Sequence, residues 1–325
     1  MQYTIKTKMS DNNNDKSNST LNALYEISAS RSTSSNTTTP ATTATTSTSR
    51  FKSEWNLSIF SLTDTNGKTI DFKNTFAPKP KLLPYGYCII KCLILIWMIT
   101  FLYVDIDTNF DPSAPTKLFW LAYLTHWGII TMFLCNILNI FQFFRFFKRN
   151  HDDANYETDN ENQQEQQRQE QQQYMDCMTR LTWIVSTVTI NISLLIVILY
   201  WVLDYKGQPV TYLNMMKHGI FALLSTIDVL VINRLPIRLK QIAFVFMFQA
   251  SYFIWSIVHS ICGIGTPFSD ESVDTDDDSI YSVLNWNARP IFAFIIVVGT
   301  MVVATPVLYL FLWFVSQCFK PRYLC

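Results

Sequence analysis

The sequence predicts an all-α polytopic membrane protein, a bundle of six transmembrane helices whose two termini both lie in the cytoplasm. Hydrophobic residues make up 49% of the 325 residues and charged residues only 15%, whereas soluble domains carry about a quarter charged residues. Five apolar stretches are long enough to cross about 30 Å of hydrocarbon as helices, and a sixth, shorter one is supported by its basic flank. The connections between them alternate between basic and acidic or nearly uncharged membrane edges. Lys/Arg-rich edges stay in the cytoplasm, so this alternation fits six spans with both ends inside.

The second span, 118–143, fixes the orientation of the bundle. It contains no Asp, Glu, Lys or Arg, and Arg145, Lys148 and Arg149 follow it at once. The residues before it are mainly acidic. This helix is therefore expected to enter the membrane from the exterior and to end on the cytoplasmic side.

The first and third spans are marked by aromatic ends as well as by apolar interiors. The first span, 84–104, has tyrosines near both ends, where interfacial aromatics are enriched. Lys91 lies about two turns inside it, and we expect its long side chain to reach back to the cytoplasmic interface. The third span, 181–203, has Trp183 near one end and Tyr200–Trp201 near the other. Both patterns indicate helices that cross the whole bilayer.

The remaining spans are 217–232, 241–264 and 290–317. The fourth is short and contains His218 and Asp228, but the basic loop NRLPIRLK follows it, with a proline that ends the helix. The fifth is rich in phenylalanine and ends in glycines. The sixth is long enough to require tilt.

The segments outside the spans differ from them in composition. Residues 1–50 are rich in Ser, Thr and Asn and predict a disordered cytoplasmic tail. Residues 51–83 form a membrane-proximal segment whose aromatics fit a membrane-surface segment and a plain linker equally. The Gln-rich connection 150–180 and residues 318–325 are expected in the cytoplasm. The outer connection around Asp270–Asp278 lacks the Gly and distal Glu of a helix-loop-helix calcium site, so we expect a solvated loop.

Composition excludes several function classes. The formal net charge is zero and no basic patch is interleaved with aromatics, so no nucleic-acid partner is expected. The seven cysteines show no paired spacing, which argues against a disulfide framework. No HxxxH or HExxH spacing is present, so neither a metal site nor a cofactor is expected. The lipid bilayer is the expected partner, and composition does not distinguish the plasma membrane from the endoplasmic reticulum.

Polar residues near the outer ends of three spans form the candidate functional site. Thr125, His126, His218 and His259 fall at similar heights, so three of the four histidines share one layer. Ionisable groups inside a membrane mark functional sites more often than chance. The alternative is that these side chains hydrogen-bond between helices and only hold the bundle together.

Acyl transfer is the chemistry that best fits this layer. It needs a hydroxyl nucleophile and an imidazole base, and Thr125 and His218 on facing helices can provide them. His126 points about 100° away from Thr125 on its helix, so it suits the base role less well. His126 or His259 could instead donate a hydrogen bond to an oxyanion.

Two further polar residues lie deeper in the membrane. Asp228 sits about midway through the fourth span, where an unpaired carboxylate is costly. We expect it to be protonated or bonded to Asn191, which lies at similar depth in the third span. A contact that fixes helix register is the simpler alternative for Asp228.

Short motifs in four spans and one connection carry a family resemblance. In order and spacing the chain resembles the rolling-stone proteins and the wider androgen-induced gene 1 family of six-span membrane proteins. The motifs are YLTHWG at Tyr123, YW at Tyr200, MKHG around Lys217, the Asp228 position, SYFIWSIVHSICG at Ser251 and YSVLNW at Tyr281.

The resemblance implies an activity and a set of site residues. Characterised members of the wider family are threonine hydrolases that cleave fatty-acid esters of hydroxy fatty acids, with a Thr in the second span and a His in the fourth. These positions match Thr125 and His218, and the family's later acidic residue and histidine match Asp228 and His259. Rolling-stone proteins are associated with myoblast fusion, so a non-enzymatic role in adhesion, fusion or signalling is the alternative. A transporter is disfavoured because the chain has no internal repeat.

Overall fold

The computed structural model describes residues 83–108, 121–155, 176–205, 207, 209–263 and 279–319. The chain divides into two compact units, Met1–Thr45 and Thr46–Cys325, and every described residue belongs to the second. The N-terminal tail, nearly all of the membrane-proximal segment, most of the Gln-rich connection and the acidic loop lie outside the described residues. The expectations for these segments remain predictions.

Six of the helices formed by the described residues are long and apolar enough to cross a membrane, which confirms the predicted all-α, six-helix membrane bundle. No strand occurs in the same residues. Several spans are composite, because π-helical or 3₁₀ turns join shorter α-helices. The elements are α4 (Leu83–Thr108), α5 (Leu124–Asn155), α7 (Cys177–Leu199), η2 (Tyr200–Asp204), α8 (Tyr212–Met215), η3 (Met216–Ile220), α9 (Phe221–Thr226), η4 (Ile227–Ile232), η5 (Leu239–Gln241), α10 (Ile242–Ile261), η6 (Ser282–Leu284), α11 (Pro290–Gly299), η7 (Thr300–Ala304) and α12 (Thr305–Cys318).

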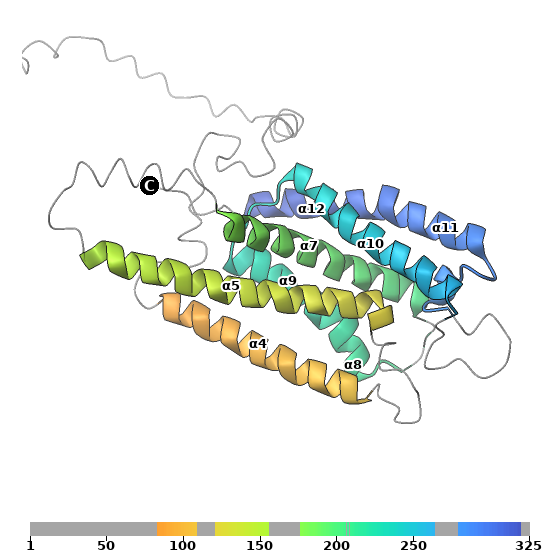
Figure 1. Ribbon diagram of the computed structural model, residues 1–325, viewed down its shortest axis with the longest axis horizontal. Helices are drawn as coiled ribbons and strands as arrows, with labels where there is room; N and C mark the ends of the chain where they lie inside the picture. The colour runs from red at the N-terminus through yellow and green to blue at the C-terminus, as the bar shows by residue number, and fades with distance from the viewer. Residues whose placement is uncertain are drawn as a thin grey trace, which may run out of the picture. The chain divides into compact units, whose positions relative to one another are not determined.

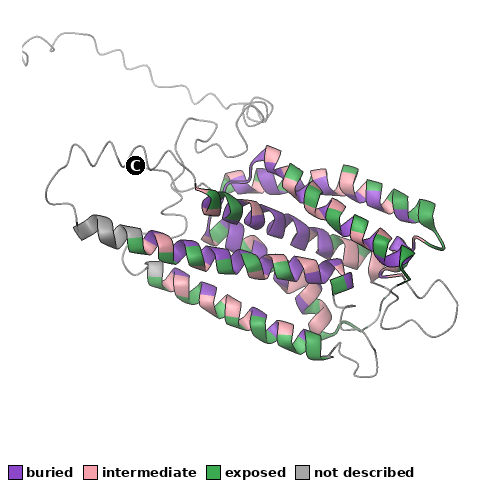
Figure 2. Ribbon diagram, in the orientation of Figure 1, coloured by how far each residue is buried: buried purple, intermediate pink, exposed green. Residues whose placement is uncertain are grey.

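Helix α7 is the centre of the bundle. It packs against α5, α9, α10 and α12, and most of its residues are buried (Figures 1 and 2). Its Trp183 is fully buried and donates an indole hydrogen bond of 2.8 Å to the carbonyl of Pro236. Gly128 brings α5 close, because a Cβ there would lie 2.6 Å from Cδ1 of Ile196. This pattern of small residues at a close crossing is typical of membrane helix pairs.

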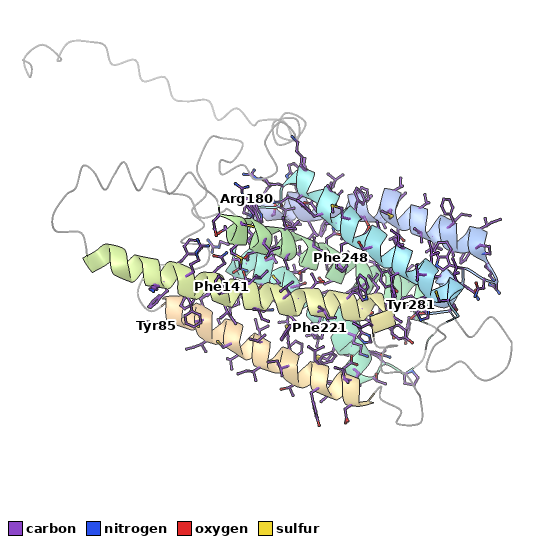
Figure 3. The ribbon with its side chains drawn as sticks, viewed as in Figure 1. Tyr85, Phe141, Arg180, Phe221, Phe248 and Tyr281 are labelled. Atoms are coloured by element: carbon purple, nitrogen blue, oxygen red, sulfur yellow. The ribbon has the colours of Figure 1, made fainter. Side chains whose placement is uncertain are left out.

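Helix α4 lies at the edge of the bundle, beside α5 (Figure 1). One of its faces is exposed and apolar, as expected for a surface that meets lipid (Figure 2). Its other face contributes Met98 and Phe101 to an apolar cluster with Met132 on α5 and with Phe221 on α9. Figure 3 shows Phe221 in this position.

The fourth span contains two π-helical turns. The turn η3 carries His218 with φ −113° and ψ 18°, outside the helical range, and η4 carries Asp228. A π turn inserts an extra residue and is frequent at functional sites. Here it frees the carbonyl of His218, which accepts a 2.8 Å hydrogen bond from the indole of Trp201.

Three spans begin at clearly different residues from those expected, and the third starts at Cys177 instead of 181. The second starts at Leu124 instead of 118, because Leu121 and Ala122 form a 3₁₀ turn whose Leu121 carbonyl accepts from the Trp127 indole at 2.8 Å. The fourth span starts earlier, at Tyr212. Thr125 therefore lies in the first turn of α5, whereas His218 lies more than one turn inside its span.

Candidate functional site

Six polar side chains gather at the end of the bundle that the charge pattern predicts to face the exterior. They come from α4, α5, η3 and the segment that precedes η6. We call this set the outer polar cluster; it consists of Asp105, Thr125, His126, Lys217, His218 and Tyr281.

A triad of Asp105, His126 and Lys217 forms one side of the outer polar cluster. The Asp105 carboxylate is fully buried, forms an ion pair with Lys217, and lies 3.1 Å from Nε2 of His126. A buried carboxylate needs such partners, because its removal from water costs several kcal/mol. The attraction of a nearby partner offsets this cost. The triad therefore ties α4, α5 and η3 together and places an imidazole and an ammonium group next in sequence to the candidate nucleophile and base.

Thr125 is buried and takes part in a chain of hydroxyl groups. Its side chain is hydrogen-bonded to Tyr281, and Tyr281 is hydrogen-bonded to Tyr252. The Tyr252 hydroxyl donates to the carbonyl of Ala122 at 3.1 Å. Burial raises the pKa of Tyr281, so its hydroxyl keeps its proton at neutral pH. Figure 3 shows Tyr281 beside the start of α5.

His218 is held in a fixed orientation. Its ring stacks on Tyr200 with centroids 3.5 Å apart and planes 4° apart, and it is 8% exposed. Its Nδ1 atom has no hydrogen-bond partner among the described residues. The ring lies within electrostatic reach of Lys217, His126 and Asp105. The arrangement supplies a positioned imidazole with one buried nitrogen that makes no hydrogen bond within the described residues.

The direct hydrogen bond expected between Thr125 and His218 is not formed. Thr125 bonds to Tyr281 instead, although both candidate residues belong to the outer polar cluster. His259 is buried on α10, where its ring contacts Trp255 edge-on with centroids 6.1 Å apart. It lies two turns beyond Tyr252 on the same helix face.

Asp228 and Asn191 lie away from the outer polar cluster, and the contact expected between them is wrong. The Asp228 carboxylate pairs with Lys91 and is approached by the amides of Asn139 at 3.5 Å and Asn233 at 3.4 Å. Asn191 is fully buried, and neither atom of its amide has a hydrogen-bond partner among the described residues.

Lys91 does not reach back to the membrane interface as expected. Its side chain is fully buried, because the Asp228 carboxylate on the fourth span provides a partner inside the bundle. Tyr87 donates a 2.9 Å hydrogen bond to Asn233, which closes the network around the pair. We call Tyr87, Lys91, Asn139, Asp228 and Asn233 the inner polar cluster. Its main role is structural, since each charge in it is paired.

Sequence reasoning missed Asp105, Lys217 and Tyr281 as members of the site. Asp105 was expected just beyond the first span, but α4 continues to Thr108 and carries it into the bundle. Tyr281 follows the acidic connection, and only its place in the YSVLNW motif could have drawn attention to it. Lys217 directly precedes His218, so its proximity to the histidine could have been anticipated.

Within the described residues no group of three or more His, Cys, Asp or Glu side chains is placed to hold a metal ion. The outer polar cluster itself offers hydroxyl, imidazole, ammonium and carboxylate groups. Comparison of the chain with protein-family models, curated proteins and solved structures finds no match. Any assignment of activity must come from the residues themselves.

Proposed function

We propose that this integral multi-pass membrane protein is a threonine hydrolase that cleaves lipid esters, such as fatty-acid esters of hydroxy fatty acids, in the outer polar cluster. One observation carries the proposal. A buried threonine hydroxyl and a buried, stacked imidazole whose Nδ1 has no hydrogen-bond partner among the described residues belong to the same cluster. The resemblance to the androgen-induced gene 1 family points to the same two residues, Thr125 and His218.

The proposed roles follow from the chemistry of the two side chains. Thr125 Oγ attacks the carbonyl carbon of the ester, the carbonyl π bond opens to an oxyanion, and the hydroxyl proton passes to His218. The oxyanion then collapses, the bond to the alcohol breaks, and the leaving alkoxide takes the proton from His218. Water attacks the acyl-threonine by the same route and releases the fatty acid.

The surroundings of the cluster suit a lipid substrate. Leu124, Met216 and Phe221 are buried apolar neighbours in sequence of Thr125 and His218, and the bundle beyond them is lined by aromatic and aliphatic side chains. Acyl chains bind such surfaces through apolar burial, worth about 0.8 kcal/mol per buried methylene. An ester within a lipid would also reach the site from the bilayer without crossing water.

The test is a lipid-ester turnover assay on the purified full-length protein in detergent or nanodiscs. The wild type is expected to release fatty acid, and Thr125→Ala and His218→Ala are expected to lose turnover by at least about 10²-fold. Thr131→Ala is the matched control, because Thr131 lies on the same helix and its hydroxyl bonds only to the Trp127 carbonyl among the described residues. Turnover that survives in Thr125→Ala would overturn the proposal, and a folded but inactive wild type would favour the non-enzymatic, rolling-stone-like role.

A further inference from the structure

We propose that Tyr281 is a third catalytic residue, whose hydroxyl donates a hydrogen bond to the oxyanion that forms when Thr125 attacks an ester. This inference rests on the proposed hydrolase function and adds a residue to its site. The observation behind it is that the hydroxyl of Tyr281 is hydrogen-bonded to Thr125, the candidate nucleophile. Tyr281 comes from a connection far from Thr125 in sequence, so this contact is created by the fold.

The directions of the hydrogen bonds can be assigned by counting protons. A carbonyl only accepts, so Tyr252 uses its single proton on Ala122. Tyr281 must then donate to the Tyr252 oxygen, and Thr125 must donate to the Tyr281 oxygen. In this resting state the lone pairs of the Thr125 hydroxyl accept no hydrogen bond from Tyr281 or Tyr252.

The hydroxyl chain cannot remove the proton of Thr125. It ends at the backbone carbonyl of Ala122, which is not a proton acceptor of useful basicity at neutral pH. The base must therefore be elsewhere, and the open Nδ1 of His218 is the available imidazole nitrogen in the cluster. When the Thr125 hydroxyl rotates toward His218, the oxygen of Tyr281 loses that hydroxyl donor, retains the hydrogen bond from the Thr125 backbone, and keeps its own proton.

Tyr281 can then turn its proton toward the substrate. The oxyanion is the former carbonyl oxygen of the ester, and it stays bonded to the carbon that Thr125 attacks. It therefore lies within a few bond lengths of the Tyr281 hydroxyl, which is already hydrogen-bonded to Thr125. A charged oxygen is a stronger acceptor than the neutral Tyr252 oxygen, so the Tyr281 hydroxyl redirects its hydrogen bond to the oxyanion as that charge forms. The attack thus forms one carbon–oxygen bond, opens one π bond and transfers one proton to His218, while Tyr281 keeps its own proton.

Burial and packing prepare Tyr281 for this role. Burial raises its pKa, so it remains a donor under conditions in which His218 is a base. Its ring is held edge-on against Tyr123, with centroids 5.8 Å apart. The segment that follows is anchored to α10, because the Trp286 indole donates to Ser256 at 3.1 Å. A preorganised donor of this kind costs no rearrangement of the backbone during the reaction.

The experiment compares Tyr281→Phe with Tyr123→Phe and Thr125→Ala in the full-length protein. Tyr123 is the matched control, because its ring contacts Tyr281 edge-on, whereas the side-chain hydrogen bonds described for Tyr281 join it to Thr125 and Tyr252. Loss of one oxyanion donor is expected to lower kcat by about 10²–10³-fold with little change in KM. Tyr123→Phe is expected to keep both constants, and melting curves of each variant report whether the fold is intact.

A second variant covers the case in which Tyr281→Phe fails to fold. Replacement of Tyr281 by 3,5-difluorotyrosine keeps the ring and hydroxyl but lowers the pKa of the phenol. If the hydroxyl must donate, the alkaline limb of the kcat–pH profile moves to lower pH. An unchanged profile, or an unchanged kcat in a folded Tyr281→Phe, overturns the inference while Thr125→Ala remains inactive. Turnover in Thr125→Ala would instead overturn the proposed function itself.

Discussion

The buried ion pair between Lys91 and Asp228 gives a quantitative test of how the bundle is held together. Both side chains are almost completely removed from the surface, at 0% and 4% exposure. Replacing Lys91 by Met leaves the Asp228 carboxylate buried with only the amides of Asn139 and Asn233 as neighbours. Removal of one partner of such a pair costs about 3–5 kcal/mol.

The same reasoning gives the expected result for the double variant. Lys91→Met together with Asp228→Leu leaves no uncompensated charge, and replacement of a buried pair by apolar residues is often neutral. The double variant should therefore unfold with a free energy close to that of the wild type. The coupling energy of the cycle is then several kcal/mol, and about 1.4 kcal/mol corresponds to a tenfold change in the unfolding constant.

The four free energies of unfolding are those of the wild type, the two single variants and the double variant. They are measured by reversible unfolding in mixed detergent micelles, monitored by tryptophan fluorescence and far-ultraviolet circular dichroism. The matched control is a second cycle on Arg145 and Asp176, whose side chains are 32% and 31% exposed. A pair exposed to that extent contributes about 0.2–1 kcal/mol. Equal coupling energies in the two cycles would refute the conclusion that Lys91 is buried and paired.

Two further predictions concern the ends and the centre of the bundle. Burial raises the pKa of Asp176, but hydrogen bonds from Thr179 and Arg145 outweigh it and the pKa is lowered. The carboxylate therefore adds stability above its unfolded pKa of about 3.9 and loses it as pH falls through the folded value. Asp176→Asn should lower the melting temperature at pH 7 but not at pH values below the folded pKa, and equal losses at both would contradict this. Gly128→Ala places a Cβ 2.6 Å from Cδ1 of Ile196 and should lower the free energy of unfolding by about 1–3 kcal/mol. Adding Ile196→Val removes that methyl group and should restore the melting temperature. A Gly128→Ala variant as stable as the wild type would show that α5 and α7 are not in close contact there.

Hydropathy and flanking charge were sufficient to predict the number and type of the helices. Each span must satisfy its own backbone hydrogen bonds in lipid, so apolar length alone predicts a helix. This worked even for the fourth span, which contains two ionisable residues, His218 and Asp228. The orientation of the bundle rests on the positions of Lys and Arg and stays a prediction.

Depth along a span was less informative than expected, because sequence does not show how each helix is rotated about its axis. Lys91 was placed at the right depth, but its partner depended on which face of α4 meets the fourth span. The same uncertainty explains the wrong contact between Asp228 and Asn191, because Asp228 pairs with Lys91 and Asn139 while the Asn191 amide has no hydrogen-bond partner among the described residues. Membership of Tyr281 in the cluster depends on a connection with no regular periodicity.

The two polar clusters place their charges in opposite ways on α4 and the fourth span. In the inner polar cluster α4 supplies the cation, Lys91, and the fourth span the anion, Asp228. In the outer polar cluster α4 supplies the anion, Asp105, and the fourth span the cation, Lys217. A shift of α4 along the bundle by one helical turn would separate both pairs at once, and reversal of its direction would bring like charges together. The pairs therefore fix the height of Asp105, and through it the position of His126 beside the candidate nucleophile, so the inner polar cluster sets the geometry of a site that it does not touch.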